Sequence, residues 1–164
     1  MLKPTQFIKL VEKEIGMIIQ LSKNIQPEML NYRPKENMRT MEELMNYISG
    51  CGYNFQSYWM TDGSLSVQDF FANLRANRTM VTIDNFEQEM KRQLENIIKL
   101  VASLNDDEWQ HKMVKYPWGE EAPIGEALIE TTIKWLTAYK YQMMMYIKMG
   151  GDVPLTTKDV WVNA

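Results

Sequence analysis

The side chains of this chain that could carry chemistry fall into two clusters at helical spacing. Tyr47 and Cys51 lie four residues apart, and Trp135 and Tyr139 repeat that spacing nearer the carboxyl end. Residues four apart share one face of a helix. If the two helices are neighbours, two phenol hydroxyls and an indole ring line a shared hollow that suits a small ligand. The alternative is that these rings are ordinary core residues.

Two polar residues extend these clusters by about one helical turn. Glu43 precedes Tyr47 by four positions, and Gln142 follows Tyr139 by three. Both are therefore candidates for the same pocket. Glu43 and Cys51 together offer only two metal donors, whereas a catalytic zinc site usually has three protein ligands. A lone cysteine in such a place is typically a small buried side chain.

Catalysis by Cys51 would need a base, and the single histidine, His111, lies in a connecting segment. A surface histidine is the simpler interpretation, although the spacing leaves a Cys51–His111 pair open. Acid–base chemistry by Tyr47 and Tyr139 also stays open. No glycine-rich phosphate loop and no Gly-x-Ser-x-Gly motif is present.

Composition excludes several classes of function. The net charge is −3, and basic and acidic residues are interspersed, so no nucleic-acid partner is expected. One cysteine excludes an internal disulfide. Residues 1–6 lack the apolar core of a signal peptide, which favours a cytoplasmic protein. The uncharged residues 44–61 approach membrane-spanning length, but their polar side chains favour a buried helix and no membrane partner.

Hydrophobic periodicity predicts four long helices, at about residues 5–25, 40–59, 83–104 and 124–149. A shorter helix, about residues 67–77, falls in the long crossover between the second and third. Residues 110–123 are expected to form a lid or short hairpin, and the tail, residues 150–164, to fold back. The chain is thus predicted to be all-α, a single four-helix-bundle domain over residues 1–164.

Local signals indicate where helices begin and where they approach one another. Thr5 is a candidate N-cap, and Thr40 with Glu43 has the capping-box pattern. Gly50 and Gly52 each weaken the second helix by roughly 1 kcal/mol. We expect these glycines to allow close contact with another helix.

Three motifs resemble those of the DinB/YfiT-like superfamily. Arg33-Pro34 followed by Arg39-Thr40-Met41-Glu42-Glu43-Leu44-Met45-Asn46-Tyr47-Ile48 is similar to that family's Arg-Pro linker and Ser/Thr-started second helix, which carries Glu-Leu and then a histidine. Trp135-Leu136-Thr137-Ala138-Tyr139-Lys140-Tyr141-Gln142 is similar to its His-x-x-x-His-Arg-Gly-Gln segment. Gly150-Gly151-Asp152-Val153-Pro154 resembles the exit from its fourth helix.

The resemblance implies a four-helix bundle, often dimeric, in which three histidines hold a divalent metal such as zinc or nickel. Members with that site include thiol-dependent transferases and metal-dependent hydrolases. Here the three histidine positions hold Tyr47, Trp135 and Tyr139. Indole has no free lone pair, and a phenol with a pKa near about 10 is a poor ligand. We therefore expect no metal site and no metal cofactor.

The leading hypothesis is a DinB-like protein of unknown specific activity that keeps an aromatic pocket for a small ligand. One alternative is a metal-dependent thiol transferase or hydrolase with a relocated site that uses Cys51, Glu43 or His111. The other alternative is a non-catalytic interaction module, a homodimer formed through uncharged faces of the first two helices.

Overall fold

Four long helices form the bundle in the computed structural model, which describes residues 2–61 and 63–162. They are α1 (Pro4–Ser22), α2 (Met41–Cys51), α4 (Phe86–Ala102) and α7 (Lys134–Gly150). Helix α1 contacts α4 and α7, and α2 contacts the same two helices. Each helix buries its apolar face between two neighbours, and the all-α bundle predicted from the sequence is confirmed.

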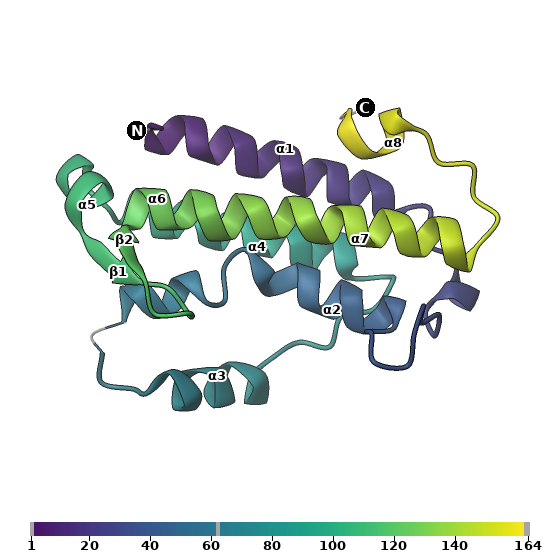
Figure 1. Cartoon of the computed structure of the whole chain (residues 1–164), viewed down its shortest axis with the longest axis horizontal. Coiled ribbons are helices and arrows are strands. Elements are labelled where there is room, and N and C mark those ends of the chain that lie inside the picture. Colours follow the sequence, from purple (N-terminus) through teal and green to yellow (C-terminus); the bar gives the residue numbers. More distant parts are fainter. Residues whose placement is uncertain (1, 62, 163–164) are drawn as a thin grey trace.

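The long crossover between the second and third bundle helices is also present. Figure 1 shows α1 and α7 running in one direction and α2 and α4 in the other, so the chain must return along the bundle between α2 and α4. That return contains a 3-10 helix, Gln56–Met60, and α3, Val67–Ala76. Helix α3 lies outside the bundle beyond α2 (Figure 1), and none of its residues is buried.

Helix α2 ends at Cys51 instead of reaching residue 59 because neighbouring helices bind its carboxyl end. The Gln93 Nε2 donates to the Ile48 carbonyl at 3.0 Å, and its Oε1 accepts from the Gly52 amide at 2.8 Å. The Thr132 hydroxyl donates to the Gly52 carbonyl at 2.8 Å. These buried polar partners satisfy the helix end, so continuation of the helix is unnecessary.

The two glycines of α2 have different roles. A Cβ on Gly52 would lie 3.3 Å from Gln93 of α4 and from Leu136 of α7, so the expected close approach occurs there. A Cβ on Gly50 would instead meet the Asn54 side chain of the same segment. The Thr40 capping box is confirmed: Glu43 N donates to Thr40 Oγ1 at 3.1 Å, and Thr40 N donates to Glu43 Oε2 at 2.7 Å.

Other helix boundaries differ by a few residues. Helix α1 has Lys3 as its N-cap instead of Thr5, and it ends at Ser22 instead of residue 25. The predicted third helix shortens to α4. The fourth begins with α6, Ile124–Leu128, and reaches α7 through one π-helical segment, Ile129–Ile133.

The connecting segments fold back as expected. After α5 (Asp106–His111), strands β1 (Met113–Lys115) and β2 (Glu121–Pro123) form an antiparallel hairpin, which confirms the hairpin alternative. In the tail, α8 (Thr157–Trp161) contacts α1 and buries Val160. Asn163 and Ala164 of the predicted tail lie outside the described residues.

Residues 44–61 do not form one continuous helix, since α2 and the 3-10 helix share them. Over the described ranges 2–61 and 63–162, no helix is both long and apolar enough to span a bilayer. The apolar faces of α1 and α2 are in the core, where Phe7, Val11, Leu44 and Ile48 are fully buried. A dimer through those faces would therefore have to open the bundle.

Candidate ligand-binding site

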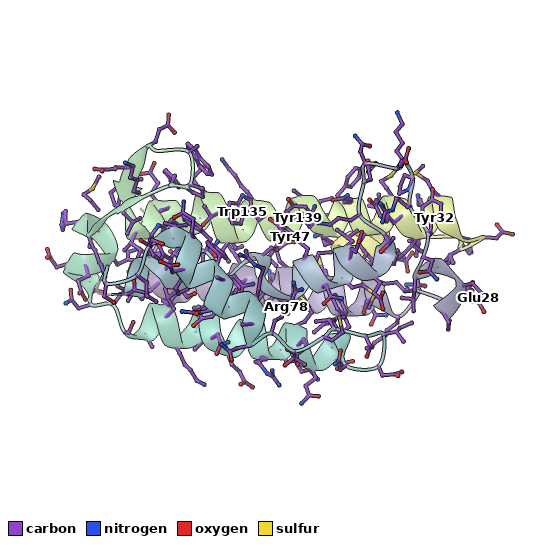
Figure 2. All side chains as sticks on the ribbon, turned by 90° about the horizontal axis from the view of Figure 1, so that it is seen from below. Glu28, Tyr32, Tyr47, Arg78, Trp135 and Tyr139 are labelled. Carbon is purple, nitrogen blue, oxygen red and sulfur yellow. The ribbon has the colours of Figure 1, made fainter. Side chains whose placement is uncertain are left out.

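The structure brings together Tyr47, Trp135 and Tyr139, the three residues at the positions where the resemblance places histidines. Tyr47 of α2 and Tyr139 of α7 contact edge to face, with ring centroids 4.7 Å apart and planes at 61°. Trp135 lies one turn before Tyr139 on α7. Figure 2 shows the three side chains gathered where α2 and α7 face each other. All three are half-buried, so their rings are neither sealed in the core nor free in solvent.

Tyr47 and Trp135 line a cavity of about 390 Å³ between α2, α3 and α7. Its remaining lining residues come from α2, from the crossover and from α3: Asn46, Cys51, Asn54, Phe55, Phe71, Leu74, Arg75 and Arg78. Phe55 contacts Trp135 at 6.5 Å between ring centroids, and it stacks on Phe71 at 6.1 Å and 17°. The lining therefore includes aromatic side chains from α2, the crossover, α3 and α7, which suits a flat ligand.

Aromatic contacts join α3 to the first part of the crossover, and one amide holds the far end of the crossover against α2. Phe70 of α3 contacts Tyr58 at 5.3 Å, beside the Phe71–Phe55 stack. At the far end of the crossover, Asn46 Nδ2 donates to the Val81 carbonyl at 3.0 Å, and Asn46 Oδ1 accepts from the Val81 amide at 3.2 Å. These contacts fix the segment between them, which carries the two arginines of the cavity.

The charged groups at the cavity are all basic. Arg75 and Arg78 line it, and the Arg39 guanidinium lies 4.1 Å above the Tyr47 ring. Arg78 Nη2 donates to the Asn46 carbonyl. Partial burial lowers the pKa of Arg78, but a guanidinium remains charged in proteins. Among the residues that the structure describes, no aspartate or glutamate lines the cavity.

Two ionisable groups of the cavity stay protonated at neutral pH. Burial raises the pKa of the Cys51 thiol to about 12, and the thiol contacts the Ile48 carbonyl at 3.6 Å. Burial also raises the pKa of Tyr47, and the neighbouring Tyr139 hydroxyl adds to this. A neutral thiol and a neutral phenol are poor nucleophiles and poor metal ligands.

Glu43 and Gln142 have structural partners outside this cavity. Glu43 Oε2 pairs with Arg33 at 3.3 Å in addition to capping α2. Gln142 Nε2 donates to the Tyr146 hydroxyl at 3.1 Å, and that hydroxyl donates to the Arg39 carbonyl at 3.0 Å. Both residues line a separate polar depression of about 610 Å³ beside the linker before α2.

His111 does not reach Cys51. It belongs to α5, at the end of the bundle beside α6, and its Nδ1 lies 3.0 Å from Asp107 Oδ1. The cavity lining offers Cys51 neither an imidazole nor a carboxylate as a base. Within the part of the chain that the structure describes, no three His, Cys, Asp or Glu side chains form a group that could hold a metal ion.

Of the ten described residues that line the cavity, three are site residues predicted from the sequence: Tyr47, Cys51 and Trp135. The missed lining residues come from α2, the crossover and α3: Asn46, Asn54, Phe55, Phe71, Leu74, Arg75 and Arg78. Arg39 of the linker, which lies against the Tyr47 ring, was also missed. The available signal was the sequence of α3 itself, where Phe71, Arg75 and Arg78 recur at spacings of four and three. That spacing places them on one side of a helix and its extension.

Comparison with known proteins bears on the fold. No family model and no curated protein matches the sequence. The crystal structure of a DinB-like protein from Bacillus subtilis matches with a TM-score of 0.68 and 16% identity, over 92% of this chain and 96% of that one. The resemblance seen in the sequence motifs is thereby confirmed at the level of three-dimensional structure. The chain has the fold of the DinB-like proteins.

Proposed function

We propose that this chain is a metal-free bundle of DinB-like fold that binds a small ligand in the cavity between α2, α3 and α7. The observation that carries the proposal is the cavity of about 390 Å³ at the place where the family's metal histidines are replaced. Pockets for small molecules are typically concave and mostly apolar, with a few polar groups that fix orientation. Trp135, Phe55 and Phe71 supply the apolar walls, and Asn54 and Arg78 supply polar groups.

The donor chemistry at the three positions supports the loss of the metal centre. Trp135 has no lone pair to offer, and the raised pKa of Tyr47 makes its phenolate less accessible than that of a free tyrosine. Cys51, the one soft donor nearby, has a thiol pKa of about 12. A metal would have to pay the cost of deprotonating a buried group before it could bind. These residues do not fit a zinc- or nickel-type site.

A neutral aromatic probe tests the proposed cavity directly. For 2-naphthamide, with about 13 non-hydrogen atoms, a typical ligand efficiency predicts a Kd of roughly 1 mM. We expect ligand-observed NMR and titration calorimetry to detect this binding. Trp135→Ala should weaken it at least about fivefold because it removes one wall of the cavity. Trp118→Ala is the matched control, since Trp118 is exposed on the hairpin side of the bundle.

Two outcomes would contradict this proposal. Binding that is equally weakened by Trp118→Ala and by Trp135→Ala would place the probe elsewhere. Stoichiometric zinc or nickel in the isolated protein, retained with micromolar or tighter affinity, would contradict the loss of the metal centre. Metal content by elemental analysis should be measured on the same preparations.

One observation favours a second candidate, the homodimeric interaction module. A shallow apolar hollow of about 450 Å³ lies along α7 and the linker before α2, and its lining includes Met38, Ala138, Tyr141, Met145 and Met149. Tyr141 and Met149 are more than half exposed. Exposed apolar patches of this kind often mark contact surfaces. Sedimentation of the wild type and of Tyr141→Glu tests this candidate, and a monomeric wild type at micromolar concentration would remove it.

A further inference from the structure

We propose that the ligand of this cavity is a flat aromatic anion of the carboxylate class, an inference that rests on the ligand-binding function proposed above. Three arginines surround the Tyr47 ring and the cavity, namely Arg39, Arg75 and Arg78. Among the described residues, no acidic side chain forms an ion pair with any of the three. The cavity therefore carries unbalanced positive charge beside aromatic walls.

The two other arginines of the chain, in contrast, form ion pairs with glutamates. Arg33 pairs with Glu43 at 3.3 Å, and Arg92 pairs with Glu89 at 3.2 Å. Arg92 lines a second cavity of about 500 Å³ beside α3, and Glu89 lines it too. Leu74 and Arg78 line both cavities. The second cavity therefore has a carboxylate that partly offsets its two arginines, whereas the described lining of the first cavity has none.

Arg78 is an exposed residue whose guanidinium is anchored to α2 by a hydrogen bond. Its backbone lies three residues before Val81, which Asn46 anchors through two hydrogen bonds. Its guanidinium donates one hydrogen bond to the Asn46 carbonyl, which leaves its other N–H groups for a ligand. A guanidinium held in place at the mouth of a partly apolar cavity can bind a carboxylate through charge-assisted hydrogen bonds.

The aromatic side chains that line the cavity favour a ligand with a planar ring. Phe71 and Phe55 stack nearly parallel, and Trp135 contacts Phe55 at 62°. A planar ring beside Trp135 and Phe71 keeps its faces and edges in favourable aromatic contact. The charged end then points toward Arg75 of α3 and toward Arg78, which follows the end of α3 at Ala76. The neutral Tyr47 phenol and Cys51 thiol add no competing negative charge.

Two probes of the same shape separate this inference from the proposed function. We would titrate 2-naphthoate and its neutral amide, 2-naphthamide, into the wild-type protein at pH 7 and low ionic strength. The carboxylate should bind at least about tenfold more tightly than the amide, because a hydrogen bond to an ion is about twice as strong as a neutral one. In Arg75→Gln/Arg78→Gln, the preference should fall below about threefold, with little change for the amide.

Control variants separate a change in carboxylate preference from changes in folding and in overall charge. Arg92→Gln removes the same charge from the neighbouring cavity and should leave the preference intact. Among the described residues, the Arg75 side chain forms no hydrogen bond, so Arg75→Gln alone should fold normally. This single variant tests the carboxylate preference even if the double variant folds poorly. Circular dichroism confirms the helical content of each variant.

Each outcome has a defined meaning. Equal affinity for naphthoate and naphthamide, with both lost in Trp135→Ala, would overturn the inference and leave the proposed function standing. No binding of either probe would overturn both. A carboxylate preference that survives in the double arginine variant would also overturn the inference, because the charge would then be recognised elsewhere.

Discussion

Replacing Glu14 by glutamine should lower the free energy of unfolding by about 3–5 kcal/mol, since Glu14 neutralises a lysine in the core. Lys140 is fully buried on α7, and its Nζ lies 2.9 Å from Glu14 Oε2 of α1. The Trp161 ring of α8 covers the ammonium at 4.1 Å, and Met17 Sδ lies 3.8 Å from it. Among the described residues, Glu14 is therefore the one anionic partner of this fully buried ammonium.

The magnitude follows from the balance of two opposing effects. At 2.9 Å and an effective dielectric constant of about 20, the attraction between Lys140 and Glu14 is about 6 kcal/mol. Burial of the ammonium costs several kcal/mol, which this attraction offsets. Glutamine keeps the size and a polar oxygen but loses the charge. Lys140→Met should cost less than Glu14→Gln, because the carboxylate that remains is partly exposed and can be hydrated.

Urea unfolding at pH 7, followed by circular dichroism, measures each of these changes. Glu14→Gln should cost much less in a Lys140→Met background than in the wild type, since the unpaired charge is then absent. Glu87→Gln, which breaks an exposed pair with Lys91, is the control and should change stability little. The reasoning is refuted if Glu14→Gln resembles this control, or if its cost is the same in both backgrounds.

Three further predictions concern the helix ends and the thiol. Gln93→Leu should cost about 2–3 kcal/mol in urea unfolding, because the Gly52 amide and the Ile48 carbonyl lose their buried partner; a cost near zero would contradict the capping role. Gly125→Ala should lower the melting temperature, with a cost of about 1–3 kcal/mol, because its Cβ would lie 2.7 Å from the Trp109 carbonyl oxygen; an unchanged melting temperature would contradict this. The Cys51 thiol should react with Ellman's reagent at pH 8 only after denaturation. Because folding raises its pKa from an ordinary 9.0 to about 12, its contribution to stability should be present below pH 9 and lost as pH rises from 9 to 12. Cys51→Ala should remove that loss.

The features that were predicted correctly depend on residues close together in the sequence. The Thr40 capping box involves residues three apart, so the pattern contains the whole interaction. The end of α2 was predicted too late for the opposite reason. Gln93 lies 41 residues from Gly52, and Thr132 lies 80 residues from it, so the partners that end the helix are invisible to a local pattern. Gly52 indicated that another helix approaches α2 closely, but it did not indicate that Gln93 and Leu136 are the side chains that contact it.

The residues of the candidate site likewise fall into two groups, those that local sequence patterns predict and those that only the folded structure brings together. Tyr47, Trp135 and Tyr139 lie on bundle helices, whose 3.6-residue periodicity shows which face is inward. Three of the other lining residues, Phe71, Leu74 and Arg75, are on α3, which has no buried residue. The periodicity of such a helix shows that Phe71 and Arg75 share a side, but it does not show which element that side faces. Only the folded crossover places them opposite Trp135.

The proposed loss of a metal centre and the proposed preference for an anion share one electrostatic cause. A divalent cation between Tyr47 and Trp135 would face Arg75 and Arg78 with no carboxylate in the cavity lining to offset them. The repulsion between like charges at short range would add to the absence of suitable donors. The same arrangement attracts an anion, and its selectivity does not depend on titration, since Tyr47 and Cys51 stay protonated well above neutral pH. On these two proposals, the bundle keeps a hollow between α2 and α7, and the positive charge of its lining favours an anion over a cation.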